Sequence, residues 1–245
     1  MSLAARLTWA ELKLFAREPF SLIFSFAFPA IILVVLAGIF GSQPDPDFGG
    51  VSPSDFYLAG YVAVVIAAIA LVALPVHVAS YRERGVLRRF RASSIPGRDV
   101  IASQIAVGLI TSMIGALVMI AIGVAIYEAA LPESPLTAVG TFALSSVSLL
   151  ALGLLVAGIT RSARAAQAVG MILFFPMWLL SGAGPPPAVL TEGMRTVSEA
   201  LPLTYAVRAM QDAWLGRATD VTDLVVLAAI LVLSGTLSAL SFRST

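Results

Sequence analysis

The chain has 245 residues, of which 59% are hydrophobic and 12% are charged, and its formal net charge is +1. Soluble globular proteins carry about 25% charged residues, so this composition excludes an ordinary soluble domain and predicts an integral membrane protein. The sequence contains no cysteine, which excludes disulfide bonds and metal sites built from thiolates.

Residues 3–18 are expected to form an amphipathic helix that Pro19 helps to end. At 100° per residue, three basic side chains fall within an arc of about 40°, and they are Arg6, Lys13 and Arg17. This pattern suits an interfacial helix in the headgroup layer, with Glu11 and Glu18 widening its polar face. The alternative is that these charges only anchor the topology. The first twenty residues lack an apolar core before a cleavage site, so we expect no cleaved signal peptide.

Six predominantly apolar runs are long enough to cross a hydrocarbon core of about 30 Å. They cover approximately residues 20–40, 57–81, 100–127, 136–160, 165–182 and 224–242. We therefore predict an all-α membrane protein with six transmembrane helices, which form a single transmembrane domain over residues 1–245.

The basic residues predict the orientation of these spans. With six spans, both termini share a side with the segment 82–99 and with the turn that holds Arg161 and Arg164. That side collects twelve of the fifteen Lys and Arg residues. Because Lys and Arg are enriched in cytoplasmic loops, we expect both termini in the cytoplasm and a multi-pass protein of the inner (plasma) membrane.

The connections on the other side are short, except for the external segment 183–223. Apolar residues occur there at helical spacing, first over residues 190–201 and then over residues 205–215. This spacing predicts one or two short helices at the outer membrane boundary. We interpret them as short external reentrant helices between spans five and six.

Residues needed for common catalytic and metal-binding motifs are missing. A P-loop needs a lysine directly after a glycine, whereas the single lysine, Lys13, is preceded by no glycine at all. His77 is the only histidine, which excludes motifs with two histidine ligands. Ser181, next to Gly182, is a candidate nucleophile, but His77 is predicted near the opposite membrane face. We expect no enzyme activity, cofactor or metal in this chain.

The interiors of the six predicted spans contain no Asp, Glu, Lys or Arg. Ion-coupled transporters and pumps usually carry such residues within their spans. The spans therefore suit an apolar or amphipathic substrate, with the energy supplied from elsewhere. An ion-coupled secondary transporter is the main alternative, and a membrane scaffold or an intramembrane enzyme is another.

The cytoplasmic segment 82–99 is the most basic part of the chain, with six arginines against Glu83 and Asp99. Gly85 and Pro96 bracket a mixed apolar and basic stretch, which favours a short amphipathic helix. One face of that helix would pack on the membrane unit, and the other would face a cytoplasmic partner. The alternative is a solvated loop that binds lipid headgroups.

Three motifs occur in order along the chain. Residues 81–96 read YRERGVLRRFRASSIP, residues 176–182 read PMWLLSG, and residues 201–205 read LPLTY. These resemble the Glu-Arg/Lys-x-Gly-Thr-Leu loop with its Ser/Thr-Pro stop, the Pro-x-x-x-Leu-Ser-Gly signature and the Leu-Pro-x-Thr-Tyr segment of the type-2 ABC exporter permeases. Since all three lie on the expected sides, the chain is identified as a member of this family.

The resemblance implies the membrane subunit of an ATP-driven exporter. It implies a homodimer, or a close heterodimer, coupled to two cytoplasmic ABC ATPase subunits that bind ATP and Mg. Coupling to the ATPases would involve Glu83, Gly85, Leu87, Arg91, Arg6, Lys13 and Arg17. The translocation path would involve Tyr61, Met171, Phe174, Phe175 and Trp178, and an external motif would contain Ser181, Gly182, Pro202 and Tyr205.

The short outer loops are similar to those of exporters for drugs, antibiotics or lipid-like compounds, and the basic loop resembles that of multidrug efflux and antibiotic resistance permeases. The expected partners are therefore the ATPases, a second permease subunit and membrane lipid, and no nucleic acid.

Overall fold

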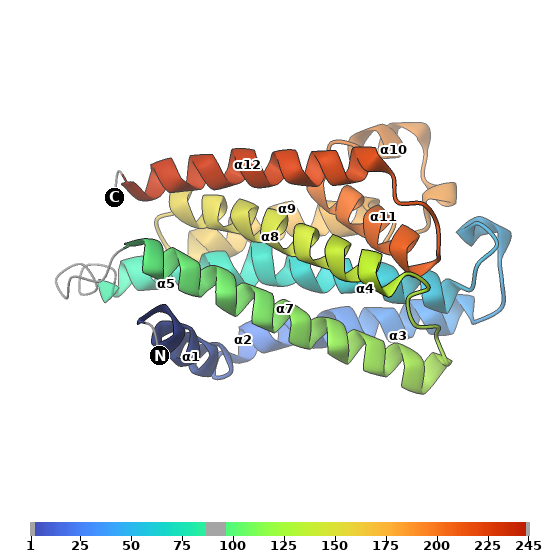
Figure 1. The fold of residues 1–245 in the computed structure, drawn as a ribbon, viewed down its shortest axis with the longest axis horizontal. Coiled ribbons are helices and arrows are strands. Elements are labelled where there is room, and N and C mark those ends of the chain that lie inside the picture. The colour runs from blue at the N-terminus through green and yellow to red at the C-terminus, as the bar shows by residue number, and fades with distance from the viewer. Residues whose placement is uncertain (1–2, 87–96, 244–245) are drawn as a thin grey trace.

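The computed structural model describes residues 3–86 and 97–243, which form a bundle of helices. Within these residues, six spans are long and apolar enough to cross a membrane, and they are Ile23–Phe40, Pro53–Glu83, Asp99–Tyr127, Pro135–Ile159, Ala163–Leu180 and Val221–Leu240. The prediction of an all-helical protein with six spans is confirmed. The N- and C-termini lie together at one end of the bundle (Figure 1), which we call the terminal end, and the opposite end is the distal end.

The spans are built from helices that are partly interrupted. Helix α1 (Leu3–Phe15) precedes the first span, which consists of α2 (Pro19–Leu22), the π-helical turn η1 (Ile23–Ala27) and α3 (Phe28–Phe40). The second span consists of α4 (Pro53–Ala68), the π-helical turn η3 (Ile69–Ala73) and α5 (Leu74–Glu83). The other spans are α7 (Gly97–Tyr127), α8 (Pro135–Ile159), α9 (Ala163–Leu180) and α12 (Val221–Arg243).

Shorter elements lie at the distal end (Figure 1). They are the 3-10 turns η2 (Pro46–Phe48) and η4 (Pro187–Val189) and the helices α10 (Glu192–Ser198) and α11 (Pro202–Trp214). Helix α11 packs against α4, α8 and α12, and its buried residues include Leu203, Val207 and Trp214. The predicted short helices are therefore present, but α11 is a buried part of the bundle, because its apolar face covers the second span.

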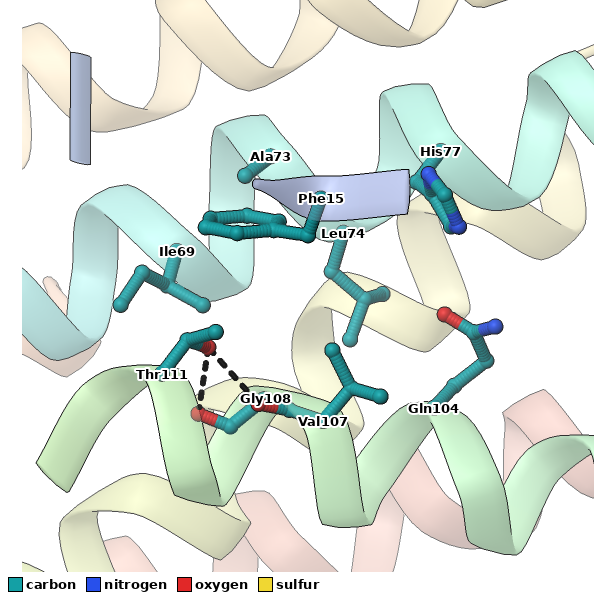
Figure 2. A pocket seen from close by; sticks show the side chains of 9 residues that line it. All are labelled: Phe15, Ile69, Ala73, Leu74, His77, Gln104, Val107, Gly108 and Thr111. Carbon is teal, nitrogen blue, oxygen red and sulfur yellow. Dashed lines mark hydrogen bonds between the residues drawn. The ribbon is translucent and has the colours of Figure 1, made fainter. Parts of the chain in front are cut away.

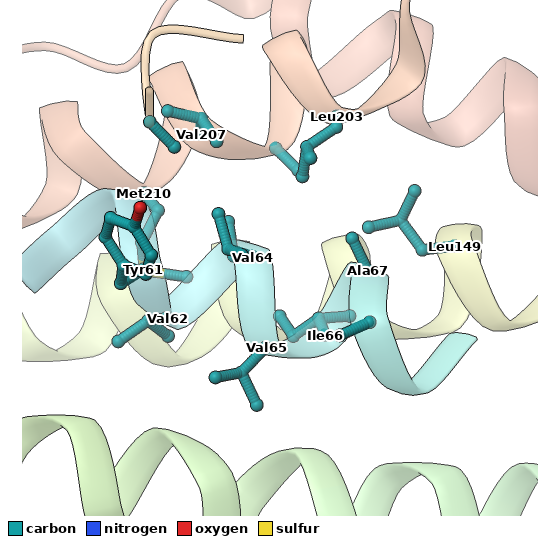
Figure 3. Packing of buried hydrophobic residues seen from close by; sticks show 14 of the residues in the cluster. Tyr61, Val62, Val64, Val65, Ile66, Ala67, Leu149, Leu203, Val207 and Met210 are labelled. Atoms are coloured by element: carbon teal, nitrogen blue, oxygen red, sulfur yellow. The ribbon is translucent and has the colours of Figure 1, made fainter. Parts of the chain in front are cut away.

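The second span is the centre of the bundle, since 89% of its most apolar window is buried. Figure 3 shows Tyr61, Val64 and Ile66 of α4 packed among side chains of α8 and α11, such as Leu149 and Val207. Association of helices in a membrane depends on close van der Waals packing rather than on water exclusion. A span surrounded on all sides transmits displacement to every neighbour that it contacts.

Proline accounts for the two π-helical turns in physical terms. In an α-helix a proline ring clashes with the carbonyl of the residue four positions earlier. For Pro29 that residue is Ser25, within η1, and for Pro75 it is Leu71, within η3. A π turn widens the helix at this point and relieves the clash. The two turns contact each other, so both irregularities lie at one depth in the bundle.

Two glycines allow neighbouring spans to approach η3 closely. A Cβ atom added to Gly153 of α8 would lie 1.8 Å from the carbonyl oxygen of Ala70, and one added to Gly170 of α9 would lie 2.2 Å from that of Leu71. No real side chain tolerates such distances. The backbones of α8 and α9 therefore lie directly against the widened turn, an approach that small residues permit between membrane helices.

The ends of several elements differ from the predicted ones. Helix α1 ends at Phe15 rather than near residue 18, and Pro19 begins α2 instead of ending the preceding helix. The second span begins at Pro53, four residues before the predicted start, because a proline fits the first turn of a helix. Helix α9 continues through Pro176 and ends at Leu180.

Candidate coupling site and translocation surface

A buried polar cluster joins α1 to the terminal end of the second span. The Glu11 carboxylate is only 3% exposed, and its Oε2 atom lies 2.6 Å from Nε2 of His77. The Tyr81 hydroxyl donates to the same oxygen at 2.5 Å. Glu11 was expected to widen the polar face of α1, and this prediction is wrong, because the carboxylate turns inward to the two α5 partners. We call these three residues the α1–α5 cluster.

A small cavity lies beside this cluster, between α1, α5 and α7. Figure 2 shows Phe15, His77 and Gln104 among the side chains that surround it. Its volume is about 20 Å³, which is enough for one water molecule. The buried Gln104 amide nitrogen has no hydrogen-bond partner within residues 3–86 and 97–243. The cavity is thus lined mainly by apolar side chains, with His77 and Gln104 among its polar groups.

The next residue along α5 ties the second span to a third element. The Arg82 guanidinium donates through Nη1 to the carbonyl oxygens of Ala157 at 3.2 Å and of Thr160 at 2.5 Å. These carbonyls lie at the C-terminus of α8, where the last carbonyl groups have no N–H donor within the helix and where cations are favoured. The start of the segment 82–99 is therefore fixed to both α1 and the α8–α9 turn.

The predicted coupling residues gather only in part at this end. Glu83 is exposed and lines a cavity of about 510 Å³ with Ser162 of the α8–α9 turn and with Arg164 and Gln167 of α9. Gly85 follows the end of α5 with a φ of 67°. Leu87, Arg91 and the predicted amphipathic helix lie outside the described residues. The basic residues of α1 and the turn after it are all exposed, and they are Arg6, Lys13 and Arg17.

The predicted path residues fall into a buried group and an exposed group. Tyr61 and Phe174 are fully buried, and Trp178 Nε1 donates to the Tyr61 hydroxyl at 3.0 Å. Phe175 is 41% exposed, whereas Met171 is half-buried. A path that includes Tyr61 therefore requires α4 and α9 to separate.

Aromatic rings of the first span extend this group, although they are not among the path residues predicted from the sequence. The Phe28 ring centroid lies 5.5 Å from that of Trp178 and 6.1 Å from that of Phe175. The Phe24 ring lies 5.3 Å from that of Phe174. Both phenylalanines lie at or next to η1, at i and i+4, and that spacing is the signal that places them on one helix face.

An apolar cavity of about 520 Å³ opens between α9 and α10 at the distal end. Phe175, Trp178 and Leu179 line it from α9, and Met194 and Val197 line it from α10. Leu179 and Val197 are both exposed. This surface offers many apolar contacts and few polar contacts, so it suits hydrophobic groups of varied shape.

The external motif is held by hydrogen bonds to backbone carbonyls. The Ser181 hydroxyl donates to the Trp178 carbonyl and is buried, so it serves the end of α9. Gly182 has a φ of 88°, which favours glycine and stops the helix. Pro202 is the first residue of α11, and the Tyr205 hydroxyl donates to the carbonyl oxygen of Glu199.

An ion pair follows the motif and fastens α11 to the sixth span. Arg208 Nη2 lies 3.2 Å from Oδ1 of the buried Asp223, and the guanidinium stacks on the Tyr205 ring at 4.9 Å. Nearby, burial raises the pKa of Asp212, whereas hydrogen bonds from Thr222 lower the pKa of Asp220. The sixth span begins at Val221 rather than at residue 224, which includes Asp223 in its first turn.

Within the described parts of the chain, no group of three or more His, Asp or Glu residues is arranged to hold a metal ion. The geometry is that of a multi-pass helical membrane protein with charged groups confined to the ends of its spans. The chain belongs to the ABC-2 type transporter family, whose model matches residues 3–215. A search among characterised proteins finds no match.

Membership confirms the resemblance to the type-2 ABC permeases. The protein is a membrane subunit of an ABC transporter, and the family implies association with ABC ATPases.

Proposed function

We propose that this chain is an export permease, two copies of which form a path for an amphipathic or hydrophobic substrate such as a drug, an antibiotic or a lipid-like compound. Two separate ATPase subunits would bind ATP and Mg and supply the energy, so the chain itself would not be an enzyme. The terminal end would face the cytoplasm, with the protein in the inner membrane.

The observation that carries this proposal is the connection from the segment 82–99 to the central span. Glu83 and Arg82 sit at the end of α5, and α5 continues through η3 into the buried α4. The α1–α5 cluster and the Arg82 contacts with α8 fix this end to its neighbours. A force applied by an ATPase at the segment 82–99 would therefore act on the whole bundle.

The surfaces near α9 support an apolar or amphipathic substrate. The cavity between α9 and α10 is lined mainly by aliphatic and aromatic side chains, and the ring cluster around Phe28 continues it toward the first span. Separation of α9 from α4 would add the Tyr61 hydroxyl and the Trp178 indole N–H to the surface. Apolar area with two polar groups fits an amphipathic molecule.

Replacing Glu83 with alanine should uncouple transport from ATP hydrolysis. Glu83 is exposed at the end of α5 and lines one cavity with Arg164 and Gln167, so its removal leaves the bundle intact while an ATPase loses a charged contact. Hydrogen bonds to charged groups contribute about 1.5–3 kcal/mol, so substrate transport should fall about tenfold or more. The measurement is transport and hydrolysis by the purified complex in vesicles.

The matched control is Glu192→Ala, which removes an exposed carboxylate at the distal end. It should transport like the unchanged protein. Transport by the chain in vesicles without an ATPase, driven by an ion gradient, would refute the proposal. Failure to co-purify with any ATP-binding subunit would refute it as well.

The homodimer in this proposal can be tested because the chain contains no cysteine. Leu179 of α9 and Val225 of α12 are both exposed apolar residues near the distal ends of their helices. If α9 faces the second copy, Leu179→Cys should form a disulfide-linked dimer of twice 25.6 kDa on oxidation in membranes. Val225→Cys should stay monomeric, and equal cross-linking of both variants would argue against this interface.

A further inference from the structure

Helix α1 presents a purely basic exposed surface because its one carboxylate is turned inward. Its described charged residues are Arg6, Glu11 and Lys13. Glu11 is buried against His77, whereas Arg6 and Lys13 are exposed. The acidic side chain that the sequence places on this helix therefore does not neutralise the exposed basic groups, and the exposed face attracts anions.

An apolar groove runs beside this basic face, between α1 and α7. Its volume is about 450 Å³, and it is lined by Ala5, Thr8, Trp9, Leu12, Ala102, Ala106 and Ile110. The α7 side of the groove spans residues 102–110, which at 1.5 Å per residue is about 12 Å of helix. Alanine on that side keeps the groove open, so it can accept a narrow, flexible apolar chain.

The charged and apolar parts meet at Trp9. The Lys13 ammonium lies 5.1 Å from the centroid of the Trp9 ring, and Trp9 also lines the groove with 58% of its surface exposed. Tryptophan is favoured at the membrane–water interface, where one side of the ring is apolar and the other is wet. The arrangement therefore places a cation at the rim of a groove suited to a hydrocarbon chain.

We propose that this groove is a binding site for an anionic phospholipid of the leaflet at the terminal end. One acyl chain lies between Leu12 and Ala106, and the phosphate lies beside the Lys13 ammonium. Charge complementarity selects the ligand: a neutral compound gains nothing from Lys13, and free phosphate gains nothing from the groove. This site is separate from the α9 surface proposed for the exported substrate.

The test is a titration of the purified full-length chain in detergent with phosphatidylglycerol or phosphatidylcholine, followed by native mass spectrometry of the retained lipid. A basic residue near an anionic membrane surface contributes about 1 kcal/mol, so Lys13→Gln should weaken phosphatidylglycerol binding about fivefold. Ala102→Phe fills the groove and should reduce binding at least as much. Phosphatidylcholine should be retained poorly by every variant.

The matched control is Arg161→Gln, which removes an exposed charge from the α8–α9 turn at the same end of the bundle. It should bind phosphatidylglycerol like the unchanged chain. Equal loss in Arg161→Gln and Lys13→Gln would overturn the proposal, because the attraction would then be a diffuse surface effect. Equal retention of the two lipids, or displacement by inorganic phosphate alone, would also overturn it. Unchanged melting temperatures show that the variants are folded.

Discussion

Replacing Glu11 with alanine should weaken the contact of α1 with the second span and abolish most transport. The substitution removes the carboxylate that joins Nε2 of His77 and the Tyr81 hydroxyl to α1. Loss of a hydrogen-bond partner by a buried polar group costs about 1–3 kcal/mol. Because the Tyr81 hydroxyl still lies 3.1 Å from Nε2 of His77, the free energy of unfolding should fall by about 1–3 kcal/mol. Thermal unfolding of the purified protein and transport in vesicles measure the two effects.

The loss of transport follows from where the cluster lies. Tyr81 is the residue before Arg82, whose contacts fix the same end of α5 to α8. When the Glu11 contact is broken, α1 still packs on α7, but one of the two attachments at the start of the segment 82–99 is lost. An applied force would then displace α5 locally instead of moving the bundle.

Two controls separate this contact from a general effect of charge. Glu18→Ala removes a carboxylate from the turn after α1 and should have little effect on stability. In a double-mutant cycle, Tyr81→Phe and Glu11→Ala together should destabilise less than the sum of the two single changes, because both break one contact. Strict additivity, or a melting temperature of Glu11→Ala equal to that of the unchanged chain, would show that the contact is absent in the protein.

The α1–α5 cluster also shows which features a sequence pattern can and cannot predict. Six apolar runs predicted six spans, because length and apolarity are local properties of the chain. The direction of Glu11 depends on His77, which is 66 positions away, and no helical periodicity reveals a partner on another helix. A single histidine near the end of a charge-free span was the available signal, since such a group requires a partner.

Helix α11 is a second element for which the sequence predicts the helix but not its surroundings. Its apolar spacing predicted a short helix, but an apolar face fits a membrane boundary and a protein interior equally well. The structure decides between them through Gln211, whose side-chain nitrogen donates to the Phe56 carbonyl at 3.3 Å, and through the Arg208–Asp223 pair. Polar groups at both positions gain partners only when α11 lies inside the bundle.

The close contact between η3 and α8 also could not be predicted from the sequence, because it joins residues of two different spans. The Leu74 N–H donates to the Ile69 carbonyl in the π-helical pattern, and Pro75 has no N–H. The Ala70 carbonyl therefore lacks a helical donor at both i+4 and i+5. Gly153 of α8 lies directly against this carbonyl, where its Cα hydrogens can make a weak C–H···O contact.

Replacing Gly153 with alanine should consequently destabilise the protein severely. The new methyl carbon would be placed 1.8 Å from the Ala70 oxygen. The backbone of α8 must therefore move away from the second span. Overpacking of this kind costs about 1–3 kcal/mol, and here backbone rather than a flexible side chain must yield, so we expect the upper end or beyond. Fluorescence-detected size exclusion during heating measures the loss even where the yield is low.

The matched control is Gly140→Ala in the same helix. An added Cβ at Gly140 has no atom within 4 Å, and alanine is favoured over glycine in helices by about 1 kcal/mol. This variant should therefore melt at the same temperature as the unchanged chain or slightly higher, so one chemical change has opposite effects at two positions of α8.

Gly170→Ala, whose Cβ would meet the Leu71 oxygen at 2.2 Å, should behave like Gly153→Ala. If all three variants melted at the same temperature, the close approach of α8 and α9 to η3 would be refuted, and so would the direct transmission of movement from the second span to its neighbours.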